Sequence, residues 1–314
     1  GLRALAGIVD NGYDFAGKTV VLDEDIDLKG DDSNQWNPIG SYGSGGTNKL
    51  PFNGAFDGGG NTISGLYINT GESAAGLFAY IGENGNVQNL AVSGTVNANA
   101  NSGGIAAYNY GTISNCYADV DVTVEKSYAG GIAGSSDGRV ENCYNLGDIK
   151  GESSVAGIVG AIYGSGLTIE NCYNFGNITG SGGSWLYVGG ILGSTTTASG
   201  AIAVSVNCYC LDTSVSDGNS HGIPLTAGQF ADSNSFGGWD FENTWVMSAE
   251  LGRPVLRSVP ESAGFEIDFE NEEARALGNH EISADGDEWV SGAGILKVTP
   301  GGTIYVREGY GAEA

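Results

Sequence analysis

Two short markers recur along this chain in step with each other. The triplet Asn-Cys-Tyr stands at 115–117, 142–144, 171–173 and 207–209, and a Gly-Ile pair stands at 104–105, 131–132, 157–158 and 190–191. The cysteines are 27, 29 and 36 residues apart, and the isoleucines are 27, 26 and 33 apart. Independent markers that keep a common spacing indicate one structural unit copied several times.

Each unit has room for three short strands and no helix of ordinary length. In one unit we expect strands near 140–144, 147–150 and 155–159, separated by Gly, Asn and Ser. Three strands per turn, stacked on the copies above and below, predict an all-β chain that folds as a parallel β-helix. Glycine makes up 55 of 314 residues, and we expect it to turn the corners at positive φ.

Stacked turns should arrange equivalent side chains in columns. An earlier, degenerate unit places Leu90 where later units have cysteine, so this position is a small apolar slot. We therefore expect a buried core column, with residues about 4.8 Å apart, formed by Leu90, Cys116, Cys143, Cys172 and Cys208. The preceding amides should form a hydrogen-bonded ladder at a bend, formed by Asn89, Asn115, Asn142, Asn171 and Asn207. The following tyrosines should form a stripe on the outer surface of the strand.

The cysteines themselves suggest no metal centre, because a column does not converge on one point as metal ligands must. Cys210 alone lies outside the repeat frame. It shares a strand face with Cys208, so a labile disulfide between these two remains open.

The two ends of the chain have sequence patterns that differ from the repeat. Residues 1–11 have apolar side chains at helical spacing and should form a short helix that caps the solenoid. Residues 18–28 alternate apolar and acidic residues and predict a strand with one solvated face, and 244–257 looks like a closing strand. We expect a β-helix with its N-terminal cap over 1–258 and a small antiparallel β module over 259–314.

The charge of the chain limits its partners. There are 12 Lys and Arg against 37 Asp and Glu, a formal net charge of −25. This argues against nucleic acids and anionic membranes, and no apolar stretch is long enough to span a bilayer. An acidic surface repels its copies, so we expect a monomer.

The entry stretch at 36–68, followed by Gly-Gly-Ile and Asn-Cys-Tyr-Asn-x-Gly units, resembles the GLUG-motif repeat proteins of bacterial cell surfaces. The resemblance covers about residues 1–257. It implies a right-handed parallel β-helix in a secreted or cell-wall-exposed, adhesin-like bacterial protein. Such repeats also stand beside metallopeptidase domains of the IgA-protease type.

No catalytic constellation is evident, and no cofactor is expected. A metallopeptidase needs two histidines four apart on a helix, whereas His221 and His280 stand alone. The enzyme alternative is a β-helix carbohydrate-active enzyme, a glycoside hydrolase or lyase, which needs opposed carboxylates. The candidates are Asp119, Asp121, Glu141, Asp148 and Glu170. Asp121 and Asp148 occupy matching positions, so they could also share a cation such as Ca²⁺.

Two of the later units carry extra residues, at 180–190 and 195–205. Insertions in repeat proteins form loops on one face, which is often the binding face. Trp185 and Tyr187 lie in the first insertion and are the candidate ligand-binding residues. The sequence therefore favours a noncatalytic adhesin-like or stalk module that binds a glycan or a host or matrix surface protein.

Overall fold

The computed structural model forms two compact units, Gly1–Val259 and Pro260–Ala314. In the first unit it describes all residues except 44–46, 72, 163–165, 183–185, 195–202 and 216–221. In the second unit it describes residues 260–261 and, of the rest, only the backbone of six strands and the Ser283 side chain.

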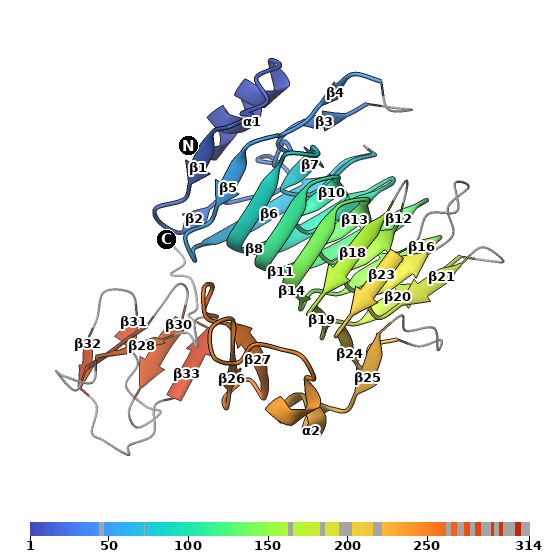
Figure 1. Cartoon of the computed structure of the whole chain (residues 1–314). Helices are drawn as coiled ribbons and strands as arrows, with labels where there is room; N and C mark the ends of the chain where they lie inside the picture. Colours follow the sequence, from blue (N-terminus) through green and yellow to red (C-terminus); the bar gives the residue numbers. More distant parts are fainter. Residues whose placement is uncertain are drawn as a thin grey trace. The chain divides into compact units, whose positions relative to one another are not determined.

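The first unit is a stack of parallel strands (Figure 1). Three sheets run along the stack. Sheet 1 contains β1 (Thr19–Val21), β2 (Ile26–Asp27), β5 (Ala55–Asp57), β6 (Thr62–Asn69), β8 (Asn86–Ala98), β11 (Thr112–Val124), β14 (Arg139–Asn145), β15 (Ile149–Gly151), β18 (Leu167–Glu170), β19 (Tyr173–Asn174), β20 (Ile178–Gly180), β23 (Ala203–Val206), β24 (Tyr209–Leu211) and β25 (Ile223–Leu225). Sheet 2 contains β9 (Ser102–Gly103), β12 (Tyr128–Gly130), β16 (Ser154–Ala156) and β21 (Tyr187–Gly189). Sheet 3 contains β7 (Phe78–Ile81), β10 (Ala106–Asn109), β13 (Ala133–Ser136), β17 (Val159–Ala161) and β22 (Leu192–Ser194).

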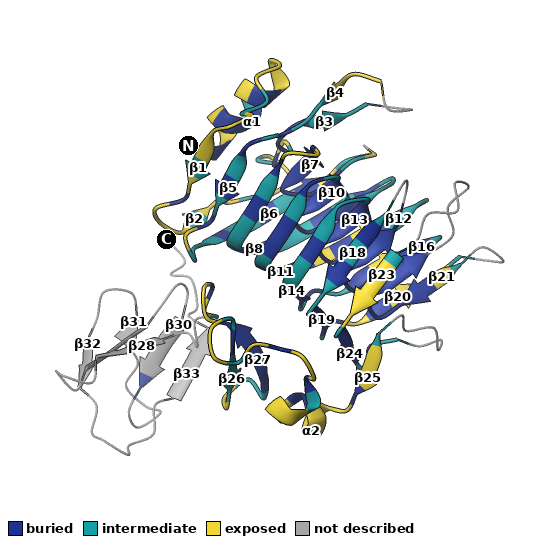
Figure 2. Ribbon diagram, viewed as in Figure 1, coloured by how far each residue is buried: buried dark blue, intermediate teal, exposed yellow. Residues whose placement is uncertain are grey.

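The register brings like residues over like residues. Cys116 pairs with Leu90 on one side and with Cys143 on the other. Val122 pairs with Val96 and Ile149 in the same way. These inward positions are fully buried (Figure 2), because each apolar side chain packs between its copies. The predicted parallel β-helix is confirmed.

The corners of the repeat are turned by asparagine. At each bend the asparagine before the core column has a φ of 50–53°, in the left-handed region: Asn89, Asn115, Asn142, Asn171 and Asn207. Asparagine tolerates this conformation because its short amide can hydrogen-bond locally. The repeat glycines at 104, 131 and 157 do not have positive φ angles. The expectation that glycine turns corners at positive φ therefore holds at other positions, such as Gly59, Gly60 and Gly94, but not at these three glycines.

These glycines are needed for space instead. A Cβ atom on Gly157 would overlap the side chain of Asn174, and one on Gly131 would overlap Asn145. The same Gly-Ile corner divides the strand expected at 155–159 into β16 and β17, which belong to different sheets.

The N-terminal end is capped by α1 (Leu2–Asp10), as predicted. Its apolar face of Leu2, Leu5, Ala6 and Val9 is buried and joins the main core. The strand expected over 18–28 is broken into β1 and β2, and Leu22, which lies between them, is buried. A separate antiparallel hairpin of β3 (Ser41–Tyr42) and β4 (Lys49–Leu50) follows.

The segment after the last repeat departs from the prediction. Residues 244–257 do not close the solenoid with one strand but form the antiparallel pair β26 (Trp245–Ser248) and β27 (Arg253–Leu256). Together with α2 (Ala227–Phe230) and η2 (Ser233–Ser235) this segment forms a lateral cover, defined here as residues 225–259.

The second unit is antiparallel, in agreement with the predicted β module. β28 (Phe265–Asp268), β29 (Glu273–Ala276) and β32 (Ile295–Lys297) form one sheet. β30 (His280–Ser283), β31 (Val290–Ser291) and β33 (Tyr305–Glu308) form another.

Candidate functional site

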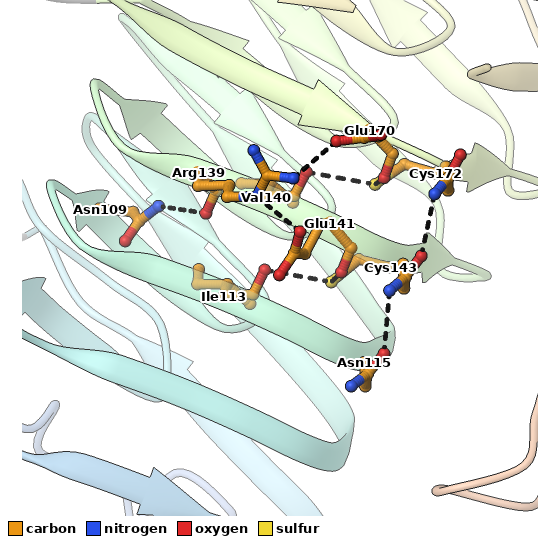
Figure 3. A network of polar contacts seen from close by, with 11 residues as sticks. Asn109, Ile113, Asn115, Arg139, Val140, Glu141, Cys143, Glu170 and Cys172 are labelled. Carbon is orange, nitrogen blue, oxygen red and sulfur yellow. Dashed lines mark hydrogen bonds and ion pairs between the residues drawn. The ribbon is translucent and has the colours of Figure 1, made fainter. Parts of the chain in front are cut away.

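The cysteine column lies inside the solenoid, and its thiols are expected to be unreactive. Cys116, Cys143, Cys172, Cys208 and Cys210 are all buried free thiols. The Cys143 Sγ atom donates to the carbonyl of Glu141 at 3.2 Å and lies 3.7 Å from the carbonyl of Ile113 (Figure 3). Burial raises the pKa of Cys143 and Cys172 well above the usual thiol range. A neutral thiol in an apolar slot is a poor nucleophile and a poor metal ligand.

Cys208 and Cys210 do not form a disulfide. Cys208 belongs to the main core cluster, whereas Cys210 pairs in register with Asn174 on the neighbouring strand. Burial raises the pKa of Cys210 to about 11.

Four of the five predicted asparagines form a hydrogen-bonded ladder along the bend. Asn142 Nδ2 donates to Asn115 Oδ1 at 3.2 Å, Asn171 to Asn142 at 3.3 Å, and Asn207 to Asn171 at 3.1 Å. Asn89 donates to the Asp57 carboxylate at 3.1 Å. The four amides from Asn115 to Asn207 are thus joined by hydrogen bonds from turn to turn, and Asn89 bonds an aspartate instead, so this row holds turns together.

Two of the candidate carboxylates are held by one arginine. Arg139 contacts Glu141 at 2.5 Å and Glu170 at 2.6 Å (Figure 3). Glu141 and Glu170 are register partners on adjacent strands, so the guanidinium screens two like charges that would otherwise face each other. The hydrogen bond to Glu141 is the largest cause that raises the pKa of Arg139.

The other acidic row ties one turn to the next. Asp121 Oδ1 accepts the backbone N–H of Asp148 at 2.9 Å. Asp148 Oδ1 in turn accepts the backbone N–H of Asn177 at 3.1 Å and its amide at 2.9 Å. Asp119 is exposed and pairs in register with Ser93. Among the described residues, no group of three His, Cys, Asp or Glu side chains is placed to hold a metal ion.

The tyrosine stripe is covered, and this corrects the sequence prediction of an outer surface. The rings of Tyr117, Tyr144 and Tyr173 stack with centroids 4.8 and 4.7 Å apart and planes within 11°. Tyr144 and Tyr173 are fully buried. The aromatic side chains of the lateral cover pack on them: Phe230, Phe236, Trp239 and Trp245. A sugar ring therefore has no access to this stripe.

A buried arginine fixes the cover in place. Arg253 Nη1 donates to the Tyr173 hydroxyl at 3.0 Å, and that hydroxyl donates to the Pro254 carbonyl at 2.7 Å. The guanidinium also lies 5.8 Å from the Tyr144 ring centroid and 5.7 Å from that of Phe175. Cation–π contacts of this kind are strongest where water is excluded.

Of the two candidate binding residues, Tyr187 lies on β21 and is 40% exposed. Trp185 falls outside the described residues, as does His221. The backbone of His280 lies in β30 of the second unit.

Sequence reasoning missed a second, inner amide pair. Asn145 and Asn174 are fully buried, and Asn145 Nδ2 donates to Asn174 Oδ1 at 2.8 Å. Each amide also donates to the carbonyl of a glycine two residues ahead, Gly147 or Gly176, at 2.8 Å. The signal was present in the fourth residue of the Asn-Cys-Tyr-Asn motif, which recurs with a glycine two positions later.

Comparison with known proteins supports the repeat. The model of the GLUG motif matches residues 98–123, a span that contains both a Gly-Gly-Ile corner and an Asn-Cys-Tyr bend. Among curated proteins none matches this chain. No helix in the described part of the chain is long and apolar enough to cross a membrane.

A solved structure shares the fold. It is a crystal structure of a "putative immunoglobulin A1 protease" from Bacteroides ovatus, with a TM-score of 0.54 and 22% identity. The match covers 82% of this chain and 90% of that one. Similarity at this level of identity speaks for the fold alone. The resemblance drawn from the repeats is confirmed: this chain carries the GLUG motif within a parallel β-solenoid of the kind that the motif's repeat proteins form.

Proposed function

We propose that this chain is a noncatalytic, extracellular adhesin-like or stalk module of a bacterial surface protein. The observation that carries the proposal is that most of the candidate reactive groups are engaged in structural contacts. The thiols are buried, Glu141 and Glu170 share Arg139, and the Asp121 and Asp148 carboxylates accept backbone N–H groups of the next turn. Groups committed to structure in this way are poor general acids, bases or nucleophiles.

The mechanism would be geometric. Stacked turns give a stiff scaffold, and the residues that differ between turns present a binding face. The extra residues of the longer units, at 180–190 and 195–205, are the candidates for that face, and the Tyr187 ring on β21 is exposed. Exposed aromatic rings dock saccharides and protein partners alike.

The test is a binding screen of the full chain on a glycan array and on immobilised matrix and host surface proteins. Specific binding that is lost in Trp185→Ala and Tyr187→Ala would support the adhesin role. Tyr13→Ala is the matched control, because Tyr13 is also an exposed tyrosine, 50% accessible, but follows α1 near the capped end. A spacer would bind nothing in the screen.

The enzyme alternative predicts a different result in the same preparation. A carbohydrate-active enzyme would release reducing ends from a polysaccharide, and a peptidase of the kind for which the similar Bacteroides ovatus protein is named would cleave immunoglobulin A1. Turnover of either substrate by the purified chain, abolished by removing one carboxylate, would overturn the proposal.

A further inference from the structure

Four tyrosines gather beside sheet 3, and two of them, Tyr80 and Tyr108, are register partners on β7 and β10. Tyr42 comes from β3, Tyr80 from β7, Tyr108 from β10, and Tyr110 follows β10 directly. The Tyr42 ring stacks on Tyr108 with centroids 3.8 Å apart, and Tyr80 meets both Tyr42 and Tyr110 edge to face, at 5.1 and 5.4 Å. The Tyr42 and Tyr110 hydroxyls lie 3.2 Å apart.

The cluster surrounds an ammonium group. The Nζ atom of Lys49 lies 4.5 Å from the ring centroid of Tyr42, 5.7 Å from that of Tyr110 and 5.9 Å from that of Tyr80. Distances within about 6 Å place a cation in the attractive field of each ring. Three rings around one nitrogen form the arrangement by which proteins recognise organic ammonium groups.

Access to this cage does not require opening the core. Lys49 is exposed and Tyr42 and Tyr110 are half-buried, whereas Tyr80 and Tyr108 form the buried floor. Lys49 is carried by the hairpin β3–β4, which pairs through only two residue pairs. A competing cation therefore has to displace one surface side chain rather than a packed element.

The charges around the cage favour a cation. Burial raises the pKa of Tyr80 and Tyr110, and the carboxylates of Glu83 and Asp137 contribute in the same direction. The phenols thus stay neutral at physiological pH, and the nearby carboxylates attract positive charge. The chain as a whole carries −25 charges, which raises the local concentration of cationic ligands.

We infer that Tyr42, Tyr80 and Tyr110 form a binding site for alkylammonium groups that Lys49 occupies in the free protein. The ligand class is a lysine-type or quaternary ammonium group, either on a partner protein or on a choline-bearing headgroup. This site does not rest on the adhesin role proposed above, and it lies on different strands from Tyr187.

The experiment titrates the full chain with choline and with its neutral isostere 3,3-dimethyl-1-butanol, by calorimetry and by chemical-shift changes of the tyrosine rings. Lys49→Met removes the internal competitor and keeps the aliphatic stem. We expect it to bind choline roughly tenfold more tightly than the wild type, which matches loss of a competing contact worth about 1.4 kcal/mol. The neutral isostere should bind neither protein.

Two further variants keep the test decisive. Lys49→Arg retains a cation in the cage and should bind as weakly as the wild type. Tyr42→Leu in the Lys49→Met background should lose binding, and circular dichroism checks that both variants keep the solenoid. Equal affinity of Lys49→Met and wild type for choline, or equal binding of the neutral isostere, would overturn the inference. If Lys49→Met perturbs the hairpin, Lys49→Gln takes its place, and its affinity for choline is compared with that of the wild type in the same way.

The binding of two probe compounds distinguishes the sources of the ammonium group. Nα-acetyl-Nε-trimethyl-lysine amide represents a protein side chain, and phosphocholine represents a headgroup. Tighter binding of the first assigns the site to a protein partner, and tighter binding of the second assigns it to a choline-bearing surface.

Discussion

Replacement of Asn142 tests whether the amide or the backbone angle matters at the bend. Asn142 has a φ of 51° and makes two ladder hydrogen bonds, to Asn115 and from Asn171. Loss of both bonds should cost about 1–3 kcal/mol of unfolding free energy, at roughly 0.5–1.5 kcal/mol each. Asn142→Ala and Asn142→Gly lose these bonds equally.

The two variants differ in the backbone term. Alanine in the left-handed region costs about 1–2 kcal/mol, whereas glycine adopts it freely but loses about 0.5–1 kcal/mol of chain entropy relative to alanine. We therefore expect Asn142→Gly to be more stable than Asn142→Ala by about 0.5–1 kcal/mol. This order is the reverse of that normally found in a strand.

Thr168 supplies the matched control. It lies on the half-buried outer face of β18, in backbone without positive φ, so Thr168→Ala should be more stable than Thr168→Gly. The measurement is equilibrium unfolding in guanidinium chloride followed by circular dichroism. If alanine is preferred over glycine at both positions, the bend at Asn142 does not depend on its left-handed angle and the reasoning fails.

Four further predictions concern groups whose surroundings the structure identifies. In native protein Cys143 and Cys172 should not react with a thiol reagent at pH 8, while all five thiols react in denaturant. Because burial raises the pKa of these two thiols in the folded state above the unfolded value of about 8.5, their contribution to stability should be complete near pH 8 and should be lost as the pH rises beyond it. An unfolding free energy that stays unchanged from pH 8 to pH 10 would contradict this. Tyr173→Phe should cost about 1–3 kcal/mol, because it leaves Arg253 and a buried carbonyl without the hydroxyl, as measured by denaturant unfolding; no loss would show that the cover is not held there. Arg139→Met should cost at most about 1 kcal/mol at low salt, since its ion pairs are half-exposed, and the difference should vanish in 1 M salt, roughly a 3 Å Debye length.

The repeat made the architecture predictable. Two markers in step define the turn, and the substitution of Leu90 for cysteine reveals a packing slot rather than a reactive group. The capping helix followed from apolar spacing at 2, 5, 6 and 9. These features depend on local pattern and on stacking of each turn on its copy, both of which are written in the sequence.

The roles of glycine and asparagine were assigned less well. Glycine was expected at positive φ at every corner, and Gly60 and Gly94 do have it, but at the bend before the core column Asn142 and its equivalents occupy that conformation. Gly157 and Gly131 instead leave room for Asn174 and Asn145. Spacing alone cannot separate a glycine required for its φ angle from one required for close approach, since both appear as an invariant small residue in the unit.

The covered tyrosine stripe and the tyrosine cage were missed for another reason. The stripe is buried by residues 225–259, which lie outside the repeat and contact it only in three dimensions. The cage draws on Tyr42 and Tyr110, which are 68 residues apart. The aromatic richness of the cover was visible in the sequence, but its partner was not.

The central claim is that successive turns lie on one another, so that equivalent side chains form columns. Anomalous diffraction from the native sulfur atoms tests this directly. We expect the Sγ atoms of Cys116, Cys143 and Cys172 to lie on one line parallel to the solenoid axis, about 4.8 Å apart. Sulfur positions scattered over unrelated layers, or gathered around a bound ion, would contradict it.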